Sequence, residues 1–380
     1  FVYNENKRKI WRRLSKKLLK KEKENPDSNN VKNIIDEQLS SKEEQLKENK
    51  KDKNNNNNSK KHINKIGNNN IITKSTKKKE EDEIGLWKCW KEHPPTQIPG
   101  NSQISLMGWS IAALRTNFYI KELGLMLDAG LSSPNWVINH LLITHCHSDH
   151  CANLPFHLYS HKPQDKIKIY VPKGIELHIK EFIESAYLLS SHTFPEEENI
   201  KREELHLYNY YELITVEPGN NIPIQIKKEK YGLEIFKCHH QVPCVGYGVY
   251  NIRKKLKEEY SKLKGKEIEE LRKKGVDINY DLINKMFVYL GDTSKEIFMD
   301  KDWGKIVEYH TINIECTFIL KEEKEQAIKT NHIHWEDLEP IVEKYNKNTF
   351  ILIHFSQRYD KSEIKKFFED KNKYNVIPWI

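Results

Sequence analysis

Cysteine is scarce in this chain of 380 residues, and long apolar runs are absent. The six cysteines form no Cys-x-x-Cys pair, and the simplest interpretation is that all of them are reduced thiols in a reducing compartment. No run approaches the roughly 18 apolar residues that a membrane-spanning helix needs, so we expect no membrane association.

Residues 1–84 lack large apolar clusters and are rich in Lys, Asn and Glu. Such a segment cannot bury enough apolar surface to offset the entropy of ordering the chain, so we predict that it is disordered. Within it, the basic stretch Lys7–Lys23 has two interpretations, an organelle-targeting leader or a basic tail that attracts polyanions. Residues 85–380 are long enough for one large α/β domain with a sizeable core.

The formal net charge of the chain is +8, which suits a polyanionic substrate. Lysine abundance by itself produces such a value, so the charge gives only weak support for RNA as a partner.

The most informative segment is His145–His150, which reads H-x-H-x-D-H and directly follows a short apolar run. Three imidazoles and a carboxylate within six residues are rarely needed for packing, but they are the donors that zinc and similar divalent ions bind. On an extended chain His145 and His147 fall on one side. Asp149 and His150 follow a turn and reach a second point, so the spacing favours two adjacent metal ions over one.

Further candidate ligands stand at the ends of other short apolar runs, as expected when loops on a sheet scaffold carry the chemistry. These residues are Asp128, His239, His240, Asp292 and His354. Strand-like runs are mixed with helical patterns such as Gly174–Ser190, so we predict two sheets with helices outside them.

The order of these residues resembles the metallo-β-lactamase superfamily: Asp128, the H-x-H-x-D-H segment, a later histidine, a Gly-Asp pair and a last histidine. The segment His354–Tyr359 is more specific. It is similar to the H-x-S-x-R-Y segment of tRNase Z, the endonuclease that trims the 3′ trailer from precursor tRNA.

Two further segments agree with the short form of tRNase Z, namely His240–Tyr247 and Glu315–Phe318, the second of which is followed by His332. The resemblance runs from about Ser105 to the C-terminus. It departs at Cys151–Asn153, where the family usually has Gly-Gly, and the P-x-K-x-R-N loop of many members is not seen. The departures leave every expected ligand in place, but they put in doubt how a pre-existing CCA end is treated.

The resemblance implies the metallo-β-lactamase fold, a four-layered αβ/βα sandwich of the α/β class with the metal site at the edge between the two sheets. It also implies two zinc ions per chain, with Mn²⁺ or another divalent ion as the alternative. The implied ligands are His145, His147 and His240 for one ion, Asp149, His150 and His354 for the other, and Asp292 as the bridge.

The implied reaction is attack on a phosphodiester by a hydroxide that both metals activate, and Asp149 is also placed to take a proton. The leaving 3′-oxygen needs a proton donor. His332 matches the family's histidine, with Glu315 orienting it, but His334 lies two residues away and is an alternative donor.

Three other residues have supporting roles in this interpretation. Ser356 and Arg358 would hold a substrate phosphate, and a structural salt bridge is the alternative for Arg358. Asp128 would fix a ligand imidazole. His239, beside the ligand His240, is the better candidate for a histidine that only packs.

The expected partners are precursor tRNA and a second copy of the chain in a homodimer. The expected location is the cytoplasm, the nucleus or, if Lys7–Lys23 is a leader, a mitochondrion or plastid. A basic insertion at about 250–285 is either a solvated helical insertion or a tRNA-gripping surface. The alternative functions are another phosphodiesterase of this fold, acting on cyclic nucleotides or other RNA, and a catalytically degenerate RNA-binding protein.

Overall fold

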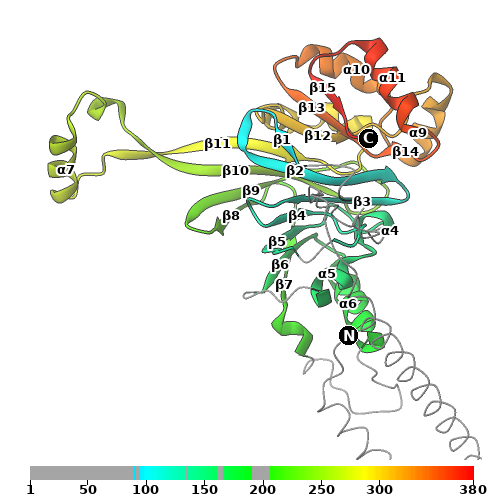
Figure 1. Ribbon diagram of the computed structural model, residues 1–380, viewed down its shortest axis with the longest axis horizontal. Coiled ribbons are helices and arrows are strands. Elements are labelled where there is room, and N and C mark those ends of the chain that lie inside the picture. Colours follow the sequence, from blue (N-terminus) through cyan, green and yellow to red (C-terminus); the bar gives the residue numbers. More distant parts are fainter. Residues whose placement is uncertain (1–89, 91–94, 134–135, 161–165, 191–205) are drawn as a thin grey trace, which may run out of the picture. The chain divides into compact units, whose positions relative to one another are not determined.

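Two sheets organise the part of the chain that the computed structural model describes, which is residue 90 and residues 95–133, 136–160, 166–190 and 206–380 (Figure 1). The predicted disordered extension, 1–84, and the basic stretch Lys7–Lys23 lie outside these residues.

The first sheet has the strand order β1-β2-β3-β4-β5-β6-β7, and β14 pairs with β2. Its strands are β1 (Thr96–Ile98), β2 (Asn101–Ala112), β3 (Arg115–Ile120), β4 (Leu125–Leu127), β5 (His140–Leu142), β6 (Ile167–Pro172), β7 (Tyr211–Val216) and β14 (Phe355–Ser356). Neighbours pair antiparallel from β1 to β4 and parallel from β4 to β7.

The second sheet has the strand order β15-β13-β12-β11-β10-β9-β8. Its strands are β8 (Asn221–Ile226), β9 (Glu229–Lys237), β10 (Val245–Leu256), β11 (Asn279–Tyr289), β12 (Thr311–Glu315), β13 (Thr349–Ile353) and β15 (Val376–Pro378). Pairing is antiparallel from β8 to β11 and parallel from β11 to β15.

The helices lie outside the sheets. They are α4 (Ser148–Cys151), α5 (Leu154–Ser160), α6 (Glu176–Ser190), α7 (Gly265–Lys273), α8 (Trp303–Ile306), α9 (Lys324–Thr330), α10 (Trp335–Lys344) and α11 (Lys361–Lys371), with 3-10 turns η2 (His206–Asn209), η3 (Glu258–Tyr260), η4 (Lys295–Met299) and η5 (Lys321–Glu323). The helix predicted over Gly174–Ser190 is confirmed as α6.

Three apolar clusters define the layers. The central cluster joins the inner faces of both sheets, for example Phe118 of β3 with Tyr289 of β11. A second cluster packs the outer face of the second sheet against α10 and α11, and a third packs the first sheet against α5 and α6. This arrangement confirms the expected four-layered αβ/βα sandwich, because apolar strand faces on both sides of each sheet must be covered.

The basic insertion at 250–285 is not mainly helical, so the helical part of that alternative is wrong. Its ends are the outer halves of the long strands β10 and β11, which pair from Tyr247↔Tyr289 out to Leu256↔Asn279. Figure 1 shows this two-stranded ribbon extending from the second sheet with α7 near its tip. Dense lysine and glutamate hide the strand pattern in the sequence, whereas pairing between distant segments stabilises it in the fold.

The described cysteines, Cys146, Cys151, Cys238, Cys244 and Cys316, are free thiols, as expected. Among the described residues, no helix is long and apolar enough to cross a membrane.

Candidate metal centre

The predicted site residues converge because the segments that carry them follow the ends of strands. Asp128 follows β4, and His354 follows β13. Both residues have left-handed backbones, with φ of 55° and 62°. Asp and His adopt this conformation more readily than most residues, and it turns the chain sharply where the strand stops.

The H-x-H-x-D-H segment forms a tight loop that leads into α4. His147 is the N-cap residue of this helix, and the amides of His150 and Cys151 donate to its carbonyl oxygen at 2.9 and 3.1 Å. The turn therefore separates His145 and His147 from Asp149 and His150, as the sequence predicts.

Two groups of donor atoms result. The first consists of His145, His147, His240 and Asp292, and the second of Asp149, His150 and His354, and within each group the donor atoms lie within 4.8 Å of one another. All seven predicted ligands are therefore brought together.

Asp292 lies between the two groups. Its Oδ2 is 3.6 Å from Nε2 of His145 and 3.9 Å from Nε2 of His240, while its Oδ1 is 3.3 Å from Nε2 of His150. Oδ2 is also 3.3 Å from Nε2 of His354. One carboxylate that faces both groups is what a bridge between two adjacent ions requires.

The donor atoms fit a metal better than they fit one another. Nε2 of His145 and Oδ1 of Asp292 are buried and make no hydrogen bond, and unsatisfied buried polar atoms are costly. Burial also lowers the pKa of His145, His147 and His240, which favours the neutral imidazole that binds metal ions.

Most of the ligand imidazoles are oriented through Nδ1. Nδ1 of His150 is 2.8 Å from Oδ2 of Asp128, Nδ1 of His354 is 3.1 Å from Oγ1 of Thr317, and Nδ1 of His240 is 3.2 Å from the carbonyl oxygen of Asn331. These contacts leave Nε2 facing the cluster. His147 is the exception, since its Nδ1 lies 3.2 Å from Nε2 of His240 and so faces the cluster itself.

Asp128 is held by its own partners. Thr144 donates to it through both its backbone amide, at 2.8 Å, and its hydroxyl, at 3.0 Å. The Tyr289 hydroxyl donates to Oδ2 at 2.7 Å. The sequence predicts that Asp128 orients an imidazole, and the structure identifies the imidazole as that of His150.

The two candidate acids, His332 and His334, have different surroundings. Nδ1 of His332 is 2.8 Å from Oε1 of Glu315, and a ring nitrogen of His332 forms a group of donor atoms with Asp292 and His354. His334 is fully buried, its Nε2 lies 2.8 Å from the Leu320 carbonyl oxygen, and its Nδ1 accepts from the Glu336 amide at 3.1 Å. His334 therefore caps α10 and faces away from the cluster.

Glu315 controls the protonation of His332. Burial lowers the pKa of His332, but the surrounding carboxylates, first Glu315 and then Asp292 and Asp149, together outweigh burial and raise the pKa to about 9. The same carboxylate accepts from the Thr317 hydroxyl at 2.6 Å and from the Thr293 and Ile333 amides at 2.8 and 3.1 Å. Glu315 is therefore fixed in place, and so is the imidazole that it holds.

The two predicted phosphate contacts lie next to this cluster in the chain. Ser356 is buried in β14, and its hydroxyl accepts from the Arg358 amide at 3.4 Å. The Arg358 guanidinium makes a contact of 3.4 Å with Glu323, and its side chain is 61% exposed. The structure thus places Arg358 in the salt bridge that is its alternative role, with most of the guanidinium turned to solvent.

Several site residues have no assigned role in the sequence interpretation. Thr317 links Glu315 to His354, and the Ala113 amide donates to Oδ2 of Asp149 at 2.9 Å. Thr317 lies inside the Glu315–Phe318 motif, so the sequence contains a signal for its role. The role of the Ala113 backbone amide has no signal in the sequence. Nε2 of His239 lies 3.0 Å from Asp300 and outside both ligand groups, in agreement with its packing role.

Gly130→Ala is expected to disrupt the centre without changing a ligand. A Cβ atom at Gly130 would lie 1.7 Å from the Asp149 carbonyl oxygen and 2.8 Å from the Thr116 amide nitrogen, so α4 would have to move. Overpacking of this kind typically costs about 1–3 kcal/mol. The temperature of thermal unfolding and the amount of bound metal should both fall. Gly304→Ala is the control, because nothing lies within 4 Å of its Cβ position, and metal loss equal in both variants would contradict this account.

Comparisons with known proteins show which sequences this chain is similar to. The chain is 29% identical over 285 residues to a chloroplastic tRNase Z of Arabidopsis thaliana, an alignment that covers 72% of this chain and 74% of that protein. It is 30% identical over 266 residues to a second tRNase Z of that plant, covering 68% and 87%. A ribonuclease Z of Methanocaldococcus jannaschii is 28% identical over 268 residues, covering 63% and 76%.

Among solved structures, the short form of human tRNase Z is 17% identical, with a TM-score of 0.42, and the match covers 72% of this chain and 94% of that one. No family model matches the chain.

Proposed function

The chain belongs to the tRNase Z family, and we propose that it uses two zinc ions to remove the 3′ trailer from precursor tRNA. It is a metal-dependent hydrolase that acts as a tRNA 3′-processing endoribonuclease. The observation that carries the proposal of two ions is the pair of adjacent donor groups that share Asp292. The imidazole-rich donor set favours zinc over magnesium or calcium.

Two divalent cations held by these residues would lower the pKa of a nearby water toward neutrality and would offset the charge that builds on the phosphate oxygens. Asp149 is the proposed acceptor of the proton from that water. Its Oδ2 is 3.2 Å from Nε2 of His354, and it also accepts from the Ala113 amide, so its orientation is fixed on two sides.

His332 is the proposed donor of a proton to the leaving 3′-oxygen. Glu315 raises the pKa of His332, which favours the protonated imidazole, and it holds Nδ1 so that the other ring nitrogen is left for a substrate atom. General acid catalysis needs a proton of this kind within hydrogen-bond reach of the leaving atom.

Ser356 and Arg358 are the proposed phosphate contacts. Because Arg358 has a single contact of 3.4 Å with Glu323 and is largely exposed, a substrate phosphate can compete for its guanidinium.

The direct test is to incubate the purified chain and zinc with a precursor tRNA that carries a 3′ trailer, and then to sequence the new ends. We expect one cut, leaving a 3′-hydroxyl on the tRNA and a 5′-phosphate on the trailer. If a cyclic nucleotide is hydrolysed and the precursor is not, the alternative phosphodiesterase is supported. Tight binding of the precursor without hydrolysis of any phosphodiester would indicate a degenerate RNA-binding protein.

The ribbon formed by residues 250–285 is a proposed grip for tRNA. Reversing Lys254, Lys255 and Lys257 to glutamate should weaken binding of precursor tRNA and flatten its salt dependence, because fewer counterions are released. Lys254 also forms an ion pair of 2.7 Å with the exposed Asp281, so the reversal removes that ion pair as well. The measurement is the Kd at several salt concentrations.

The matched control for this variant reverses Lys347, Lys365 and Lys366, which are exposed on the side of the fold that carries α10 and α11. It changes the net charge by the same amount, so equal losses of affinity in both variants would reduce the ribbon to a solvated surface. Hydrolysis of bis(p-nitrophenyl) phosphate, if it is a substrate, should be unchanged in both.

Residues 85–380 are the proposed catalytic domain. Deleting residues 1–84 should leave the temperature of thermal unfolding and the rate of the chemical step unchanged. The predicted core and all proposed ligands lie within residues 85–380. A deletion variant that fails to fold or to bind metal would contradict this division.

We also propose a homodimer and a location in the cytoplasm, the nucleus or an organelle. Analytical ultracentrifugation of the full chain tests the first, and microscopy of a fluorescent protein fused after residue 84 tests whether Lys7–Lys23 directs import. The similarity to a chloroplastic relative supports including an organelle among the compartments.

A further inference from the structure

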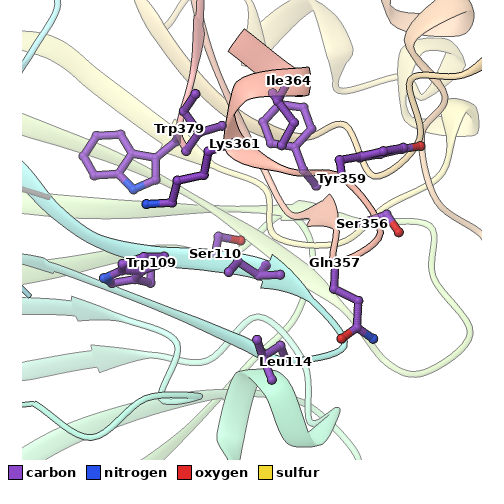
Figure 2. A pocket seen from close by; sticks show the side chains of 12 residues that line it. Trp109, Ser110, Leu114, Ser356, Gln357, Tyr359, Lys361, Ile364 and Trp379 are labelled. Atoms are coloured by element: carbon purple, nitrogen blue, oxygen red, sulfur yellow. The ribbon is translucent and has the colours of Figure 1, made fainter. Parts of the chain in front are cut away.

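Trp90 lies outside every motif of the metal centre, yet its side chain is only 3% exposed. Its ring packs edge-on against Trp136, with the ring centroids 4.5 Å apart, and Trp136 stacks on Tyr119 of β3 at 4.4 Å. Trp109 belongs to the same apolar cluster as Trp90, and it also lines a cavity of about 240 Å³ whose wall includes Ser356 (Figure 2). Aromatic packing therefore attaches Trp90 to the first sheet.

The indole of Trp90 also makes a directed contact with the chain that follows Asp128. Its Nε1–H donates to the Ser132 carbonyl oxygen at 3.0 Å. Ser132 lies in the loop formed by residues 129–133 (the 129–133 loop), which begins directly after the residue that orients His150. Trp90 is therefore placed to affect the metal centre through this loop.

The start of the 129–133 loop is bonded to the segment that carries Asp149 and His150. The Ala129 amide donates to the His150 carbonyl oxygen at 2.6 Å, and the Ala129 carbonyl oxygen accepts from the Asn153 amide at 2.8 Å. The Asn153 side-chain amide donates to the Gly130 carbonyl oxygen at 2.9 Å. The loop therefore holds the backbone of α4 relative to the first sheet.

The buried His157 of α5 bonds the rest of the loop. Its Nε2 donates to the Leu131 carbonyl oxygen at 3.0 Å, and its Nδ1, the acceptor in a neutral ring, lies 3.1 Å from the Ser133 hydroxyl. Each carbonyl oxygen from residue 129 to residue 132 thus accepts a hydrogen bond. Three of the donors come from residues 153–157, and the donor to Ser132 is Trp90.

The helix α4 needs support of this kind. It has four residues, and no side chain makes a capping hydrogen bond at its N-terminus. A helix of one turn is not stable through its own hydrogen bonds, so tertiary contacts must hold it in place. Because α4 carries Asp149 and His150, these contacts also set the position of two ligands of the second donor group.

We propose that Trp90 is a positioning residue for α4, and so for the second proposed metal ion, and that it acts through its hydrogen bond to Ser132. This inference rests on the proposed centre of two ions. Without the indole N–H, the Ser132 carbonyl oxygen loses this donor, the 129–133 loop is held less tightly, and α4 is free to move. His240 and Asp292 follow strands of the second sheet and stay in place, so the first donor group is affected less.

The test compares two conservative substitutions in the full chain. Trp90→Phe keeps an aromatic ring in the apolar cluster and removes the N–H group that donates to Ser132. Trp303→Phe is the matched control. Trp303 is also buried, in the cluster on the outer face of the second sheet, and its Nε1 makes no hydrogen bond to any described residue.

Zinc binding to the metal-free proteins, measured by competition with a chromophoric chelator, should separate the two ions. In Trp90→Phe we expect one ion to bind as in the unaltered chain and the other to bind about 10-fold more weakly, which is the lower end of the loss when an outer partner of a metal ligand is removed. In Trp303→Phe both ions should bind as in the unaltered chain. Equal weakening of both ions in Trp90→Phe, the same weakening in the control, or unchanged binding in Trp90→Phe would each overturn the proposal.

Hydrogen exchange of the metal-free full chain gives a readout that does not depend on the number of ions. The amides of His150, Cys151 and Asn153 donate hydrogen bonds within the α4 turn or to the 129–133 loop. Peptides that contain these amides should exchange about 2- to 10-fold faster in Trp90→Phe than in the unaltered chain or in Trp303→Phe, as expected when one hydrogen bond is lost.

Equal exchange in all three proteins would overturn the positioning role of Trp90. If the unaltered chain binds a single ion while exchange changes as expected, the proposed centre of two ions fails and the role of Trp90 in positioning α4 stands.

Discussion

The His147→Ala variant is expected to lose metal and activity together. The unaltered chain, purified without added zinc, should contain close to two metal ions. His147 belongs to the donor group with His145, His240 and Asp292, and its Nδ1 faces His240. Removing it leaves that group without one of its imidazoles. Loss of an outer partner of a metal ligand already costs about 10–100-fold, so removing a ligand should cost on the order of 10³-fold or more.

The measurements are metal content by elemental analysis and the rate of precursor cleavage. His239→Ala is the matched control, because His239 lies one residue from a ligand, pairs with Asp300 and belongs to neither donor group. It should retain both metal ions and most of the activity. A metal content of about one ion per chain in the gently purified unaltered protein would refute the dinuclear centre. Full activity in His147→Ala would remove His147 from the ligand set.

The His332→Ala variant should slow cleavage by about 10²–10⁴-fold while retaining both metal ions and substrate affinity. His332 is held by Glu315 and presents its other nitrogen to the cluster, but the proposed ligand set is complete without it. The rate of the unaltered chain should fall at alkaline pH as the His332 imidazole loses its proton. Bound cations would lower the pKa from the value of about 9 that Glu315, Asp292 and Asp149 together produce. In the variant this alkaline decline should disappear.

Single-turnover rates across pH, metal content and the Kd for precursor separate the possible roles of His332. His334→Ala is the control. Losing an N-cap side chain should lower stability by about 1 kcal/mol and leave the rate of the folded protein near normal. Metal loss from His332→Ala would show that His332 is a ligand, and an unchanged rate would assign the proton to another group.

The chemical identity of the site follows from the sequence by itself. Zinc-type donors are particular residue types, and the H-x-H-x-D-H spacing places them locally, on a short extended stretch and the first turn of a helix. The same local logic holds for the helix α6, whose apolar period is visible in the chain. The similarity of His354–Tyr359 to tRNase Z likewise depends only on neighbouring residues.

Only the tertiary structure shows that His332 and His334 have different surroundings. They are two residues apart in the chain, and what separates them is which ring nitrogens are occupied, by Glu315 for one and by the backbone of Leu320 and Glu336 for the other. The shape of the 250–285 ribbon and the cavity beside Ser356 were also decided there. Cross-strand pairs and cavity walls join residues far apart in the chain, so no local pattern of apolar and charged side chains encodes them.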